Sequence, residues 1–498
     1  MSMIRVENLT FSYPSSYDTI FEGVSFQIDT DWKLGLIGRN GRGKTTLLRL
    51  LQGQEEYQGR IQAAVQFDYF PYPVREPHRQ TGQILQEVCP QAQEWELRRE
   101  LSCLEVRKDA LERPFSTLSN GEQTKVLLAA LFLNEGHFLL IDEPTNHLDT
   151  EARAVVAAYL RRKKGFILVS HDRSFLDVCV DHILSINRAD IEVQSGNFSS
   201  WYENFCRQQE FELAQDARLR KSIAEMEQAA RQTKRWSDAV EKSKNGARTG
   251  GAKADKGYIG HKAAKMTQRA KNLENRQQRA IEEKSALLRN REWAEELKIH
   301  PLPYFSETLL TLSGVAPAYG GTAVCAPVTL AVQQGERILL DGRNGSGKSS
   351  LLRLLTGQPV EHCGTLSLGS GLVISYVPQD PSGLQGTLED FVAESGIEET
   401  LFKAILRKMD FSRLQFEKRM EDFSAGQKKK VLLARSLCQR AHLYLWDEPL
   451  NYIDLYTRLQ IEELIRAFSP TMVLVEHDRA FQQGVATRTV RLAALPQH

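Results

Sequence analysis

The stretch Gly38-Arg-Asn-Gly-Arg-Gly-Lys44-Thr45 occurs a second time, with two changes, as Gly342-Arg-Asn-Gly-Ser-Gly-Lys348-Ser349. Both copies fit the pattern GxxxxGK[ST], a glycine-rich loop that presents backbone N–H groups to phosphates at the start of a helix, with a lysine that adds positive charge. A short apolar run precedes each copy and a leucine-rich run follows it, so each copy is predicted to join a buried strand to a helix. Two such copies in one chain predict two phosphate-binding domains of the α/β class.

Three further motifs follow each loop in the same order and at nearly the same spacing. Counting from the loop lysine, the serine of a Ser-x-Gly motif lies 75 residues on in the first half and 76 in the second, and the glutamate of an Asp-Glu pair lies 99 and 100 residues on. A histidine stands a further 28 and 29 residues along the chain. The members, first half then second, are Ser119 and Ser424, Glu143 and Glu448, and His171 and His477. The chain is therefore predicted to be a tandem duplication.

These residue types suit the hydrolysis of a nucleoside triphosphate. The Asp-Glu pairs and the histidines follow apolar runs predicted as parallel strands, whose carboxyl ends form the ligand-binding edge of an α/β sheet. We expect the loop hydroxyls and the aspartates to hold Mg²⁺, the glutamates to act as general bases toward water, and the histidines to touch the γ-phosphate. The predicted metal ligands are Thr45, Asp142, Ser349 and Asp447, and the predicted catalytic residues include Glu143, Glu448, His171 and His477.

Together these motifs resemble those of the ABC ATPases over both halves of the chain. In that family two domains face head to tail, so that each ATP lies between the phosphate loop of one domain and the signature motif of the other. The resemblance implies a first site with Gly38, Asn40, Gly41, Gly43, Lys44, Thr45, Thr46, Ser424 and Gly426, and a second with Gly342, Asn344, Gly345, Gly347, Lys348, Ser349, Ser350, Ser119 and Gly121. Tyr13 and Tyr319 match the aromatic residue that stacks on adenine, and a buried core tyrosine is the alternative for each.

One position departs from the family pattern in the first half only. The family has a glutamine after the strand that follows the phosphate-loop helix, and Gln379 of Tyr-Val-Pro-Gln fits this pattern as a further catalytic residue. The first half has Tyr72 there, in Tyr-Phe-Pro-Tyr. A phenol cannot reproduce the paired donor and acceptor of an amide. The first site is therefore expected to couple hydrolysis to movement differently from the second, or more slowly.

The segment between the halves is predicted to be a helical hairpin. No proline occurs between Trp201 and Pro301. Residues spaced by three or four positions from 219 to 240 and from 266 to 280 are mostly apolar, with polar members at 233, 237 and 277. Such a stripe is what two antiparallel helices need in order to pair. Glycines within 242–260 separate the two helices. The predicted organisation is an ABC ATPase domain at 1–206, a basic hairpin linker at 207–299 and a second ABC ATPase domain at 300–498.

The hairpin has a charge that the rest of the chain lacks. Residues 231–279 contain 14 lysines and arginines against 4 acidic residues, a net charge of +10 in a chain whose total is +1, so all other residues together have −9. A localised cationic stripe attracts phosphate backbones with a strong dependence on salt, and a solvated linker is the alternative. The predicted RNA-contacting residues are Lys242, Lys244, Arg248, Lys253, Lys256 and Tyr258.

The paired domains and the basic hairpin, with Ser-Gly-Asn-Phe-Ser-Ser-Trp-Tyr at 195–202, resemble the ABC-F group of ribosome-associated ATPases. The motifs at 423–430 and 446–454 look most like the Lsa and Vga antibiotic-resistance branch. Housekeeping members often have an arm in the first domain, whereas here Tyr72 to Ser119 is 47 residues and Gln379 to Ser424 is 45, which leaves no room for one.

The resemblance implies a function on the ribosome. An ATP-bound form would enter the exit site and push the hairpin toward the peptidyl-transferase centre, in contact with 23S rRNA and the P-site tRNA. It would displace lincosamide, pleuromutilin and group A streptogramin antibiotics, with hydrolysis releasing the protein. We expect a monomer in which the two ABC domains pair with each other and which needs no other protein. The alternatives are a general ABC-F translation factor without a drug role, and a tandem nucleotide-binding subunit of a membrane transporter.

Composition agrees with a globular protein of the cytoplasm. Of 498 residues, 41% are hydrophobic and 26% charged, which is an ordinary balance for such proteins. No run approaches the ~18 consecutive apolar residues of a membrane span, and the N-terminus lacks the apolar core of a signal peptide. The seven cysteines form no CxxC pair, so we expect no disulfide or zinc site, and we predict buried thiols in a reducing compartment.

Overall fold

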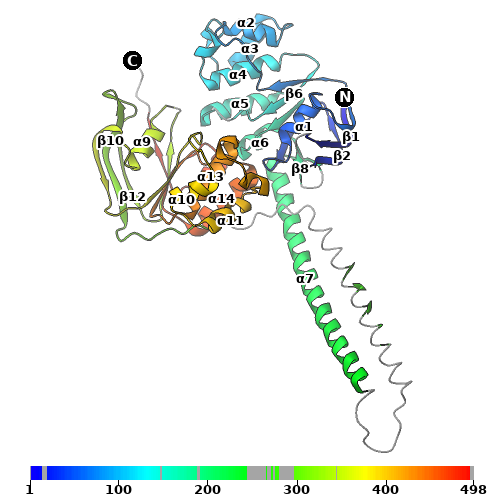
Figure 1. The fold of residues 1–498 in the computed structure, drawn as a ribbon. Coiled ribbons are helices and arrows are strands. Elements are labelled where there is room, and N and C mark those ends of the chain that lie inside the picture. The colour runs from blue at the N-terminus through cyan, green and yellow to red at the C-terminus, as the bar shows by residue number, and fades with distance from the viewer. Residues whose placement is uncertain are drawn as a thin grey trace, which may run out of the picture. The chain divides into compact units, whose positions relative to one another are not determined.

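The computed structural model describes residues 2–13, 19–145, 148–187, 191–243, 297–343 and 345–493, together with residues 265, 268, 271, 272, 275, 276, 278 and 279 (Figure 1). The chain forms two compact units. One consists of residues 1–186, 191–199 and 294–498 and contains both phosphate loops, and the other consists of residues 187–190 and 200–293.

The first half contains two sheets. A three-stranded antiparallel sheet has the order β2-β1-β4, with β1 (Met3–Ser12), β2 (Thr19–Asp29) and β4 (Gln58–Gln62). A six-stranded sheet has the order β5-β6-β7-β3-β8-β9, and all of its pairs are parallel except β8 with β9. Its strands are β5 (Gln66–Phe70), β6 (His137–Asp142), β7 (Phe166–Val169), β3 (Lys33–Gly38), β8 (His182–Ile186) and β9 (Ile191–Ser195).

The second half repeats this arrangement. Strands β10 (Thr308–Tyr319), β11 (Thr322–Ala323), β12 (Val328–Gln333) and β14 (Glu361–Leu368) form the antiparallel sheet. The parallel sheet has the order β15-β16-β17-β13-β18, with β15 (Ile374–Val377), β16 (Leu443–Asp447), β17 (Met472–Val475), β13 (Arg337–Asp341) and β18 (Arg488–Arg491). In both halves the phosphate-loop strand lies beside the strand that precedes the histidine, which lies beside the Asp-Glu strand. The motifs therefore meet at one sheet edge, and the predicted fold of two tandem α/β domains is confirmed.

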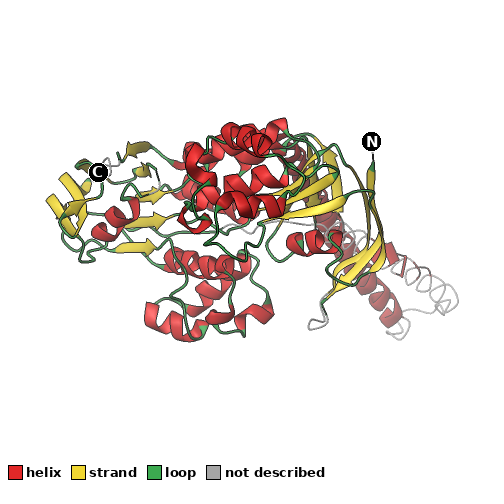
Figure 2. Cartoon of the chain, turned by 90° about the horizontal axis from the view of Figure 1, so that it is seen from above, coloured by secondary structure: helices red, strands yellow, loops and turns green. Residues whose placement is uncertain are grey.

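Helices flank these strands (Figure 2). The first half has α1 (Lys44–Leu51), α2 (Thr81–Val88), α3 (Glu94–Cys103), α4 (Asn120–Leu131), α5 (Thr150–Arg162) and α6 (Arg173–Cys179), with short 3₁₀ turns at Lys108–Leu111 and Phe115–Thr117. The second half has α9 (Lys348–Leu355), α10 (Leu388–Ser395), α11 (Glu399–Lys408), α12 (Arg413–Phe416), α13 (Ala425–Cys438), α14 (Leu455–Phe468) and α15 (Arg479–Val485), with a 3₁₀ turn at Met420–Asp422. Every residue of β7, β16 and β17 is buried, as expected of parallel strands covered on both faces.

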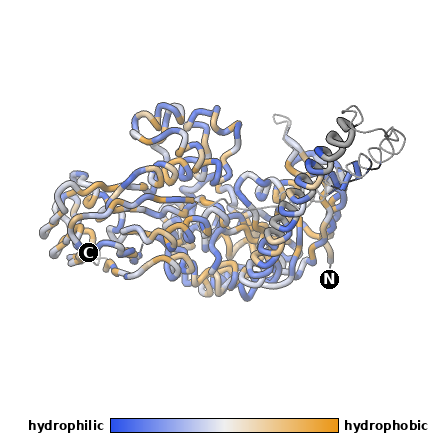
Figure 3. The backbone as a smooth tube through the Cα atoms, turned by 90° about the horizontal axis from the view of Figure 1, so that it is seen from below, coloured by the Kyte–Doolittle hydropathy of each residue, from blue (hydrophilic) through white to orange (hydrophobic). Residues whose placement is uncertain are grey.

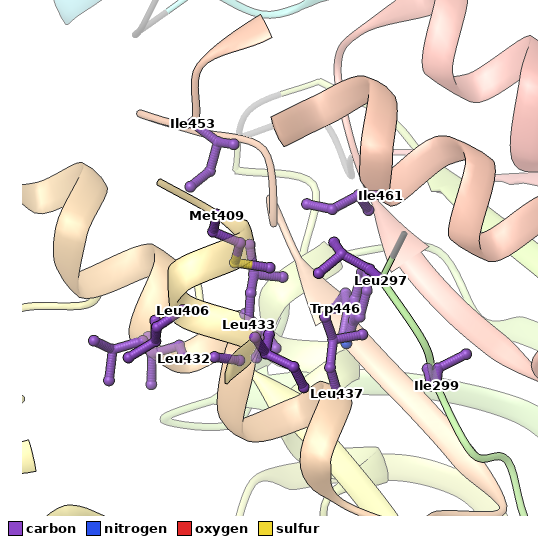
Figure 4. Close-up of a cluster of buried hydrophobic side chains, with 14 of the residues drawn as sticks. Leu297, Ile299, Leu406, Met409, Leu432, Leu433, Leu437, Trp446, Ile453 and Ile461 are labelled. Carbon is purple, nitrogen blue, oxygen red and sulfur yellow. The ribbon is translucent and has the colours of Figure 1, made fainter. Parts of the chain in front are cut away.

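The chain just before the second half belongs to the core of that half. Leu297 and Ile299 are buried among side chains of α11, α13 and β16, including Leu406, Leu433 and Trp446 (Figure 4). Burying a side chain of this size stabilises a fold by about 1.5–3 kcal/mol. Leu297 and Ile299 therefore contribute to the hydrophobic core of the second half.

The linker begins with one long helix. Helix α7 (Phe198–Ser243) has 46 residues and is about 69 Å long at ~1.5 Å per residue. The eight described residues between 265 and 279 are helical and exposed, in agreement with the predicted return helix. Figure 3 shows hydrophilic and hydrophobic residues interspersed along the coloured part of α7. Within the described part of the chain, no helix combines the length and the apolar character that crossing a membrane requires.

The cysteines are all free thiols, but the prediction that they are buried is correct for only three of the seven, because Cys206 and Cys438 are half-buried and two others are exposed. Cys103 lies in the last turn of α3 and Cys363 in β14, most of whose residues face solvent, so both thiols are exposed.

Candidate active sites

The phosphate loops have the same geometry in both halves. Gly43 and Gly347 precede α1 and α9 with φ of 90° and 84°, a left-handed conformation that favours glycine. At Gly43 a Cβ atom would lie 2.5 Å from the Ile20 side chain, so the loop has no room for another residue there. Lys44 Nζ donates to the carbonyl oxygens of Gly38 and Arg39 at 2.7 and 3.2 Å.

Lys348 repeats these contacts in the second loop. Its Nζ donates to the carbonyl oxygens of Gly342 and Arg343 at 2.6 and 2.9 Å. Burial lowers the pKa of Lys44 and of Lys348, and nearby carboxylates oppose that effect. Each ammonium thus lies at the centre of its loop, where it can approach the phosphates of a bound nucleotide.

The aspartates predicted as metal ligands lie beside the loop hydroxyls. Asp142 Oδ2 accepts hydrogen bonds from Thr45 Oγ1 and from the hydroxyl of Tyr69, both at 3.0 Å. Burial raises the pKa of Asp447 to about 6, and a hydrogen bond from Ser349 opposes this rise. Asp447 Oδ1 is buried and has no hydrogen-bond partner.

This donor set fits Mg²⁺. No group of three or more His, Cys, Asp or Glu side chains among the described residues could hold a metal ion by itself. Mg²⁺ is commonly held by one or two carboxylates together with waters and substrate phosphates. The Thr45 hydroxyl beside the Asp142 carboxylate matches that requirement in the first half. In the second half the buried Asp447 Oδ1, which has no hydrogen-bond partner, is available as a ligand.

Both glutamates have a strained backbone and a histidine neighbour. Glu143 and Glu448 have φ of 50° and 46°, and each backbone N–H donates to the last residue of the neighbouring strand, Val169 or Val475, at 2.9 Å. The distance from the histidine Nε2 to the glutamate Oε1 is 3.4 Å in the first half and 3.5 Å in the second. A left-handed backbone for a non-glycine residue costs of order 1–3 kcal/mol and is concentrated at functional sites.

The two glutamates differ in pKa. Burial and the neighbouring Asp142 raise the pKa of Glu143 to about 8. Burial would also raise the pKa of Glu448, but hydrogen bonds from His477, Gln379 and Asn451 lower it to about 2. The pKa of Glu448 is therefore well below that of Glu143, and part of the cause is the glutamine that the first site lacks.

The second phosphate loop and the first signature motif line one cavity. This cavity of ≈ 710 Å³ is lined by Ser119 and Gly121 together with Lys348, Ser349, Gln379, Glu448 and His477, among other residues. Ser119 caps α4, and its hydroxyl accepts from the backbone N–H of Glu122. The contact of Thr150 Oγ1 with His477 Nδ1 at 3.4 Å also joins the halves. The structure thus brings together the predicted partners of the second site.

The first phosphate loop makes a direct hydrogen bond to the second half. Asn40 Nδ2 donates to the carbonyl oxygen of Tyr452 at 2.9 Å. A Cβ atom on Gly426 would lie 2.6 Å from the same carbonyl oxygen and 3.4 Å from Asn40 Nδ2. Ser424 caps α13, and its side chain is exposed. The predicted neighbours Asn40 and Gly426 therefore approach each other in the first site.

The two aromatic candidates make equivalent contacts. The hydroxyl of Tyr13 lies 3.1 Å from Thr46 Oγ1, and that of Tyr319 lies 3.0 Å from Ser350 Oγ. Tyr319 is 53% exposed, which excludes a buried core role, whereas Tyr13 is partly buried against the core of the first half. The stacking of adenine on these rings stays a prediction.

Several predicted residues cannot be placed. Asn344 and five of the six predicted RNA-contacting residues lie outside the described residues; the five are Lys244, Arg248, Lys253, Lys256 and Tyr258. The sixth, Lys242, lies within α7.

Sequence reasoning missed three residues that contact the sites. Tyr69 binds Asp142, Asn451 donates to Glu448, and Tyr452 accepts from Asn40. Tyr69 had a signal in the sequence, because Tyr376 repeats it at the equivalent position of the second half. The other two begin the stretch Asn-Tyr-Ile-Asp at 451–454, which corresponds to Asn-His-Leu-Asp at 146–149 of the first half.

The protein family described as ABC transporter matches residues 21–146 and 325–451. The energy-dependent translational throttle protein EttA of Haemophilus influenzae is 27% identical over 521 residues, covering 94% of this chain and 88% of EttA. The ribosome protection protein VmlR of Bacillus subtilis is 28% identical over 483 residues, covering 94% and 83%.

Solved structures are similar at lower identity. One is archaeal ribosome recycling factor aABCE1, in complex with the ribosomal stalk protein aP1, with a TM-score of 0.65 and 18% identity, covering 98% of this chain and 88% of that chain. At this identity the similarity concerns the fold alone.

Proposed function

We propose that this chain, which belongs to the ABC transporter family, is a ribosome-binding protein of the ABC-F group. The chain contains the ATPase domain of that family twice, and these two domains bind and hydrolyse ATP. The relatives EttA and VmlR belong to that group, and their names refer to translation and to ribosome protection. The observation on which the proposal depends most is the length of α7, 46 residues, because joining two ATPase domains requires far less. A helix of about 69 Å that leads into the basic segment 231–279 suits a binding site deep in RNA.

Each ATP would be bound by residues from both halves. In the second site Lys348 would neutralise phosphate charge, while Ser119 and Gly121 would close over the nucleotide from the other half. Thr45 with Asp142, and Ser349 with Asp447, would hold Mg²⁺, which when bound neutralises charge that develops on the phosphates. The remaining nucleotide-binding roles are proposed for the loop, signature and aromatic residues named in the sequence analysis.

Hydrolysis would depend on the glutamates. Glu448, with its ionised carboxylate, would accept a proton from the attacking water, while His477 and Gln379 orient that carboxylate and the water. Glu143 and His171 would have the same roles in the first site at a lower rate. The chain itself thus supplies the base, the orientation of the water and the exclusion of solvent.

We further propose that residues 231–279, with their net charge of +10, enter the ribosomal exit site in the cytoplasm. There they would contact 23S rRNA and the P-site tRNA, and they would displace lincosamides, pleuromutilins and group A streptogramins. The support for the drug role is the similarity to VmlR. The similarity to EttA favours a second candidate, a translation factor without a drug role.

A trapping experiment tests ribosome binding. The double variant Glu143→Gln, Glu448→Gln should hold ATP without hydrolysing it, and ribosomes should copurify with it from cells. Copurification of membrane permease subunits without ribosomes would instead support the transporter alternative.

Drug protection is tested by expression in a susceptible bacterium. The inhibitory concentrations of a lincosamide and a pleuromutilin should rise with the intact chain and stay low with a deletion of residues 231–279. If the intact chain leaves both concentrations unchanged while still binding ribosomes, the drug role is wrong and the general translation factor is supported.

A further inference from the structure

A lysine of the second signature helix lies fully buried at the edge of the second active site. Lys429 is 0% exposed, and its Nζ donates to the carbonyl oxygens of Pro378, Gln379 and Asp447 at 2.7, 3.2 and 3.1 Å. A lysine ammonium has three N–H donors and no acceptor. Three carbonyl oxygens therefore satisfy it completely.

These acceptors come from two segments that carry site residues. Pro378 and Gln379 follow β15, and Asp447 ends β16 immediately before Glu448. The lysine itself belongs to α13, whose first turn contains Gly426, the residue that approaches Asn40 of the first loop. One side chain thus connects the glutamine loop and the Asp-Glu strand of the second site to a helix that serves the first.

The ammonium is held in place by charge as well as by hydrogen bonds. Burial lowers the pKa of Lys429 to about 8, and the carboxylates of Asp447, Glu476 and Glu448 oppose this. Hydrogen bonds to a charged donor are roughly twice as strong as neutral ones. The contact is therefore a strong restraint on the main chain at Gln379 and Asp447.

The first half lacks this connection. Counting from the capping serines Ser119 and Ser424, the residue equivalent to Lys429 is Thr124 on α4, whose hydroxyl ends three bonds short of where an ammonium would be. Thr124 lines a cavity of ≈ 390 Å³ together with Pro71, Tyr72 and Asp142, the equivalents of the three residues that Lys429 joins. At equivalent positions, the second half thus has the Lys429 side chain with its three hydrogen bonds, and the first half has a cavity.

We propose that Lys429 is a positioning residue of the second ATPase site, which fixes Gln379 and the Asp447-Glu448 strand end against the signature helix. Its three donors all go to main-chain carbonyl oxygens, so it acts through the main chain at Gln379 and Asp447. This inference rests on the roles proposed for Gln379, Asp447 and Glu448. Small displacements of such groups are costly in rate, since catalysis depends on their orientation.

The test compares steady-state ATP hydrolysis by the full chain and its variants. Lys429→Met keeps the length and volume but removes the donors, and we expect kcat to fall about tenfold while KM for ATP changes less than about twofold. Lys429→Arg keeps the charge, but its planar donors cannot reach three converging carbonyls, so kcat should fall by an intermediate factor.

A matched control separates positioning from loss of stability. Tyr444→Phe removes one partly buried hydrogen bond, from the hydroxyl to the Gln439 carbonyl oxygen, near the start of β16 and not at the end that carries Asp447. It should lower the melting temperature and leave kcat unchanged. Wild-type kcat in Lys429→Met, or a loss that matches its unfolded fraction, would overturn the inference. If Lys429→Met does not fold, Lys429→Arg takes its place, and a wild-type kcat in that variant, or a loss that matches its unfolded fraction, would overturn the inference.

Glu448→Gln is measured in parallel. If it abolishes hydrolysis while the Lys429 variants retain wild-type kcat, only the positioning role is wrong. If Glu448→Gln itself retains wild-type kcat, the proposed general base is wrong and the positioning role is overturned with it.

Discussion

At the scale of single residues, the two active sites differ although their motifs match. Glu448 is contacted by His477, Gln379 and Asn451, whereas the first half has Tyr72 in place of the glutamine. We therefore expect Glu448→Gln to lower kcat by about 10²-fold and Glu143→Gln to leave it almost unchanged, because nearly all turnover would occur at the second site. The measurement is the steady-state ATPase rate of each variant, and equal losses would contradict the asymmetry.

The same comparison predicts a gain of function. Tyr72→Gln restores an amide at the position where Gln379 stands in the second half. Hydrolysis by the Glu448→Gln background, which leaves only the first site, should then rise by about threefold. Tyr72→Phe in the same background is the control, since it adds no amide and should not raise the rate.

Most of the residues that meet at the two sites could be predicted from the repeated sequence motifs. The loop lysines, aspartates, glutamates and histidines repeat at fixed spacing, so their meeting at one sheet edge followed from parallel strands. Lys429 could not be found in this way, because a run of three lysines at 428–430 is typical of a solvated surface. Only the fold shows that two of the three are buried.

At the scale of elements, the contact between the halves depends on Gly426, a residue without a side chain in the first turn of α13. A Cβ atom on Gly426 would press on the Tyr452 carbonyl oxygen and approach Asn40. Gly426→Ala should lower kcat at least about tenfold, because the first loop and the second signature could no longer approach. Gly383→Ala is the control, since nothing lies within 4 Å of a Cβ atom there. Wild-type activity in Gly426→Ala would show that this approach is not needed.

The start of α14 makes a prediction about acid stability. Asp454 caps that helix and pairs with buried Lys430, with Nζ 2.8 Å from Oδ2. Burial would raise the pKa of Asp454, but Lys430 and the backbone N–H of Thr457 lower it below its ordinary value of 3.8. A lowered folded-state pKa stabilises the fold above the unfolded value, and this contribution is lost as the pH falls through the folded value.

Asp454→Asn should accordingly lower the free energy of unfolding by about 3–5 kcal/mol at pH 7. The difference from wild type should narrow as the pH falls below 3.8. Urea unfolding at pH 7, 4 and 3 measures both effects. A difference that stays constant over this range would show that the carboxylate charge is not the cause.

At the scale of the whole molecule, sequence spacing predicted the order of the domains, while the boundaries at 206 and 299 stay predictions. The apolar stripes at 219–240 and 266–280 predicted two helices, and α7 with the described residues of the return arm agrees. Sequence could not predict that Leu297 and Ile299 are core residues of the second half. Two apolar residues in a polar stretch are too few to define a periodic pattern. Only the structure shows that they pack against α11 and α13.

The division of charge predicts how the proposed RNA binding depends on salt. Residues 231–279 have a net charge of +10 within a chain of +1. Each phosphate contact steepens the fall of log K with log salt by about 0.7–0.9. Replacing Lys244, Arg248 and Lys253 by glutamine should therefore make the slope for ribosome binding shallower by about 2–3. Replacing Lys108, Arg413 and Lys418, which are exposed on the ATPase domains, is the matched control and should leave the slope unchanged. If both triple variants change the slope equally, the attraction comes from the overall charge of the protein and not from the arm.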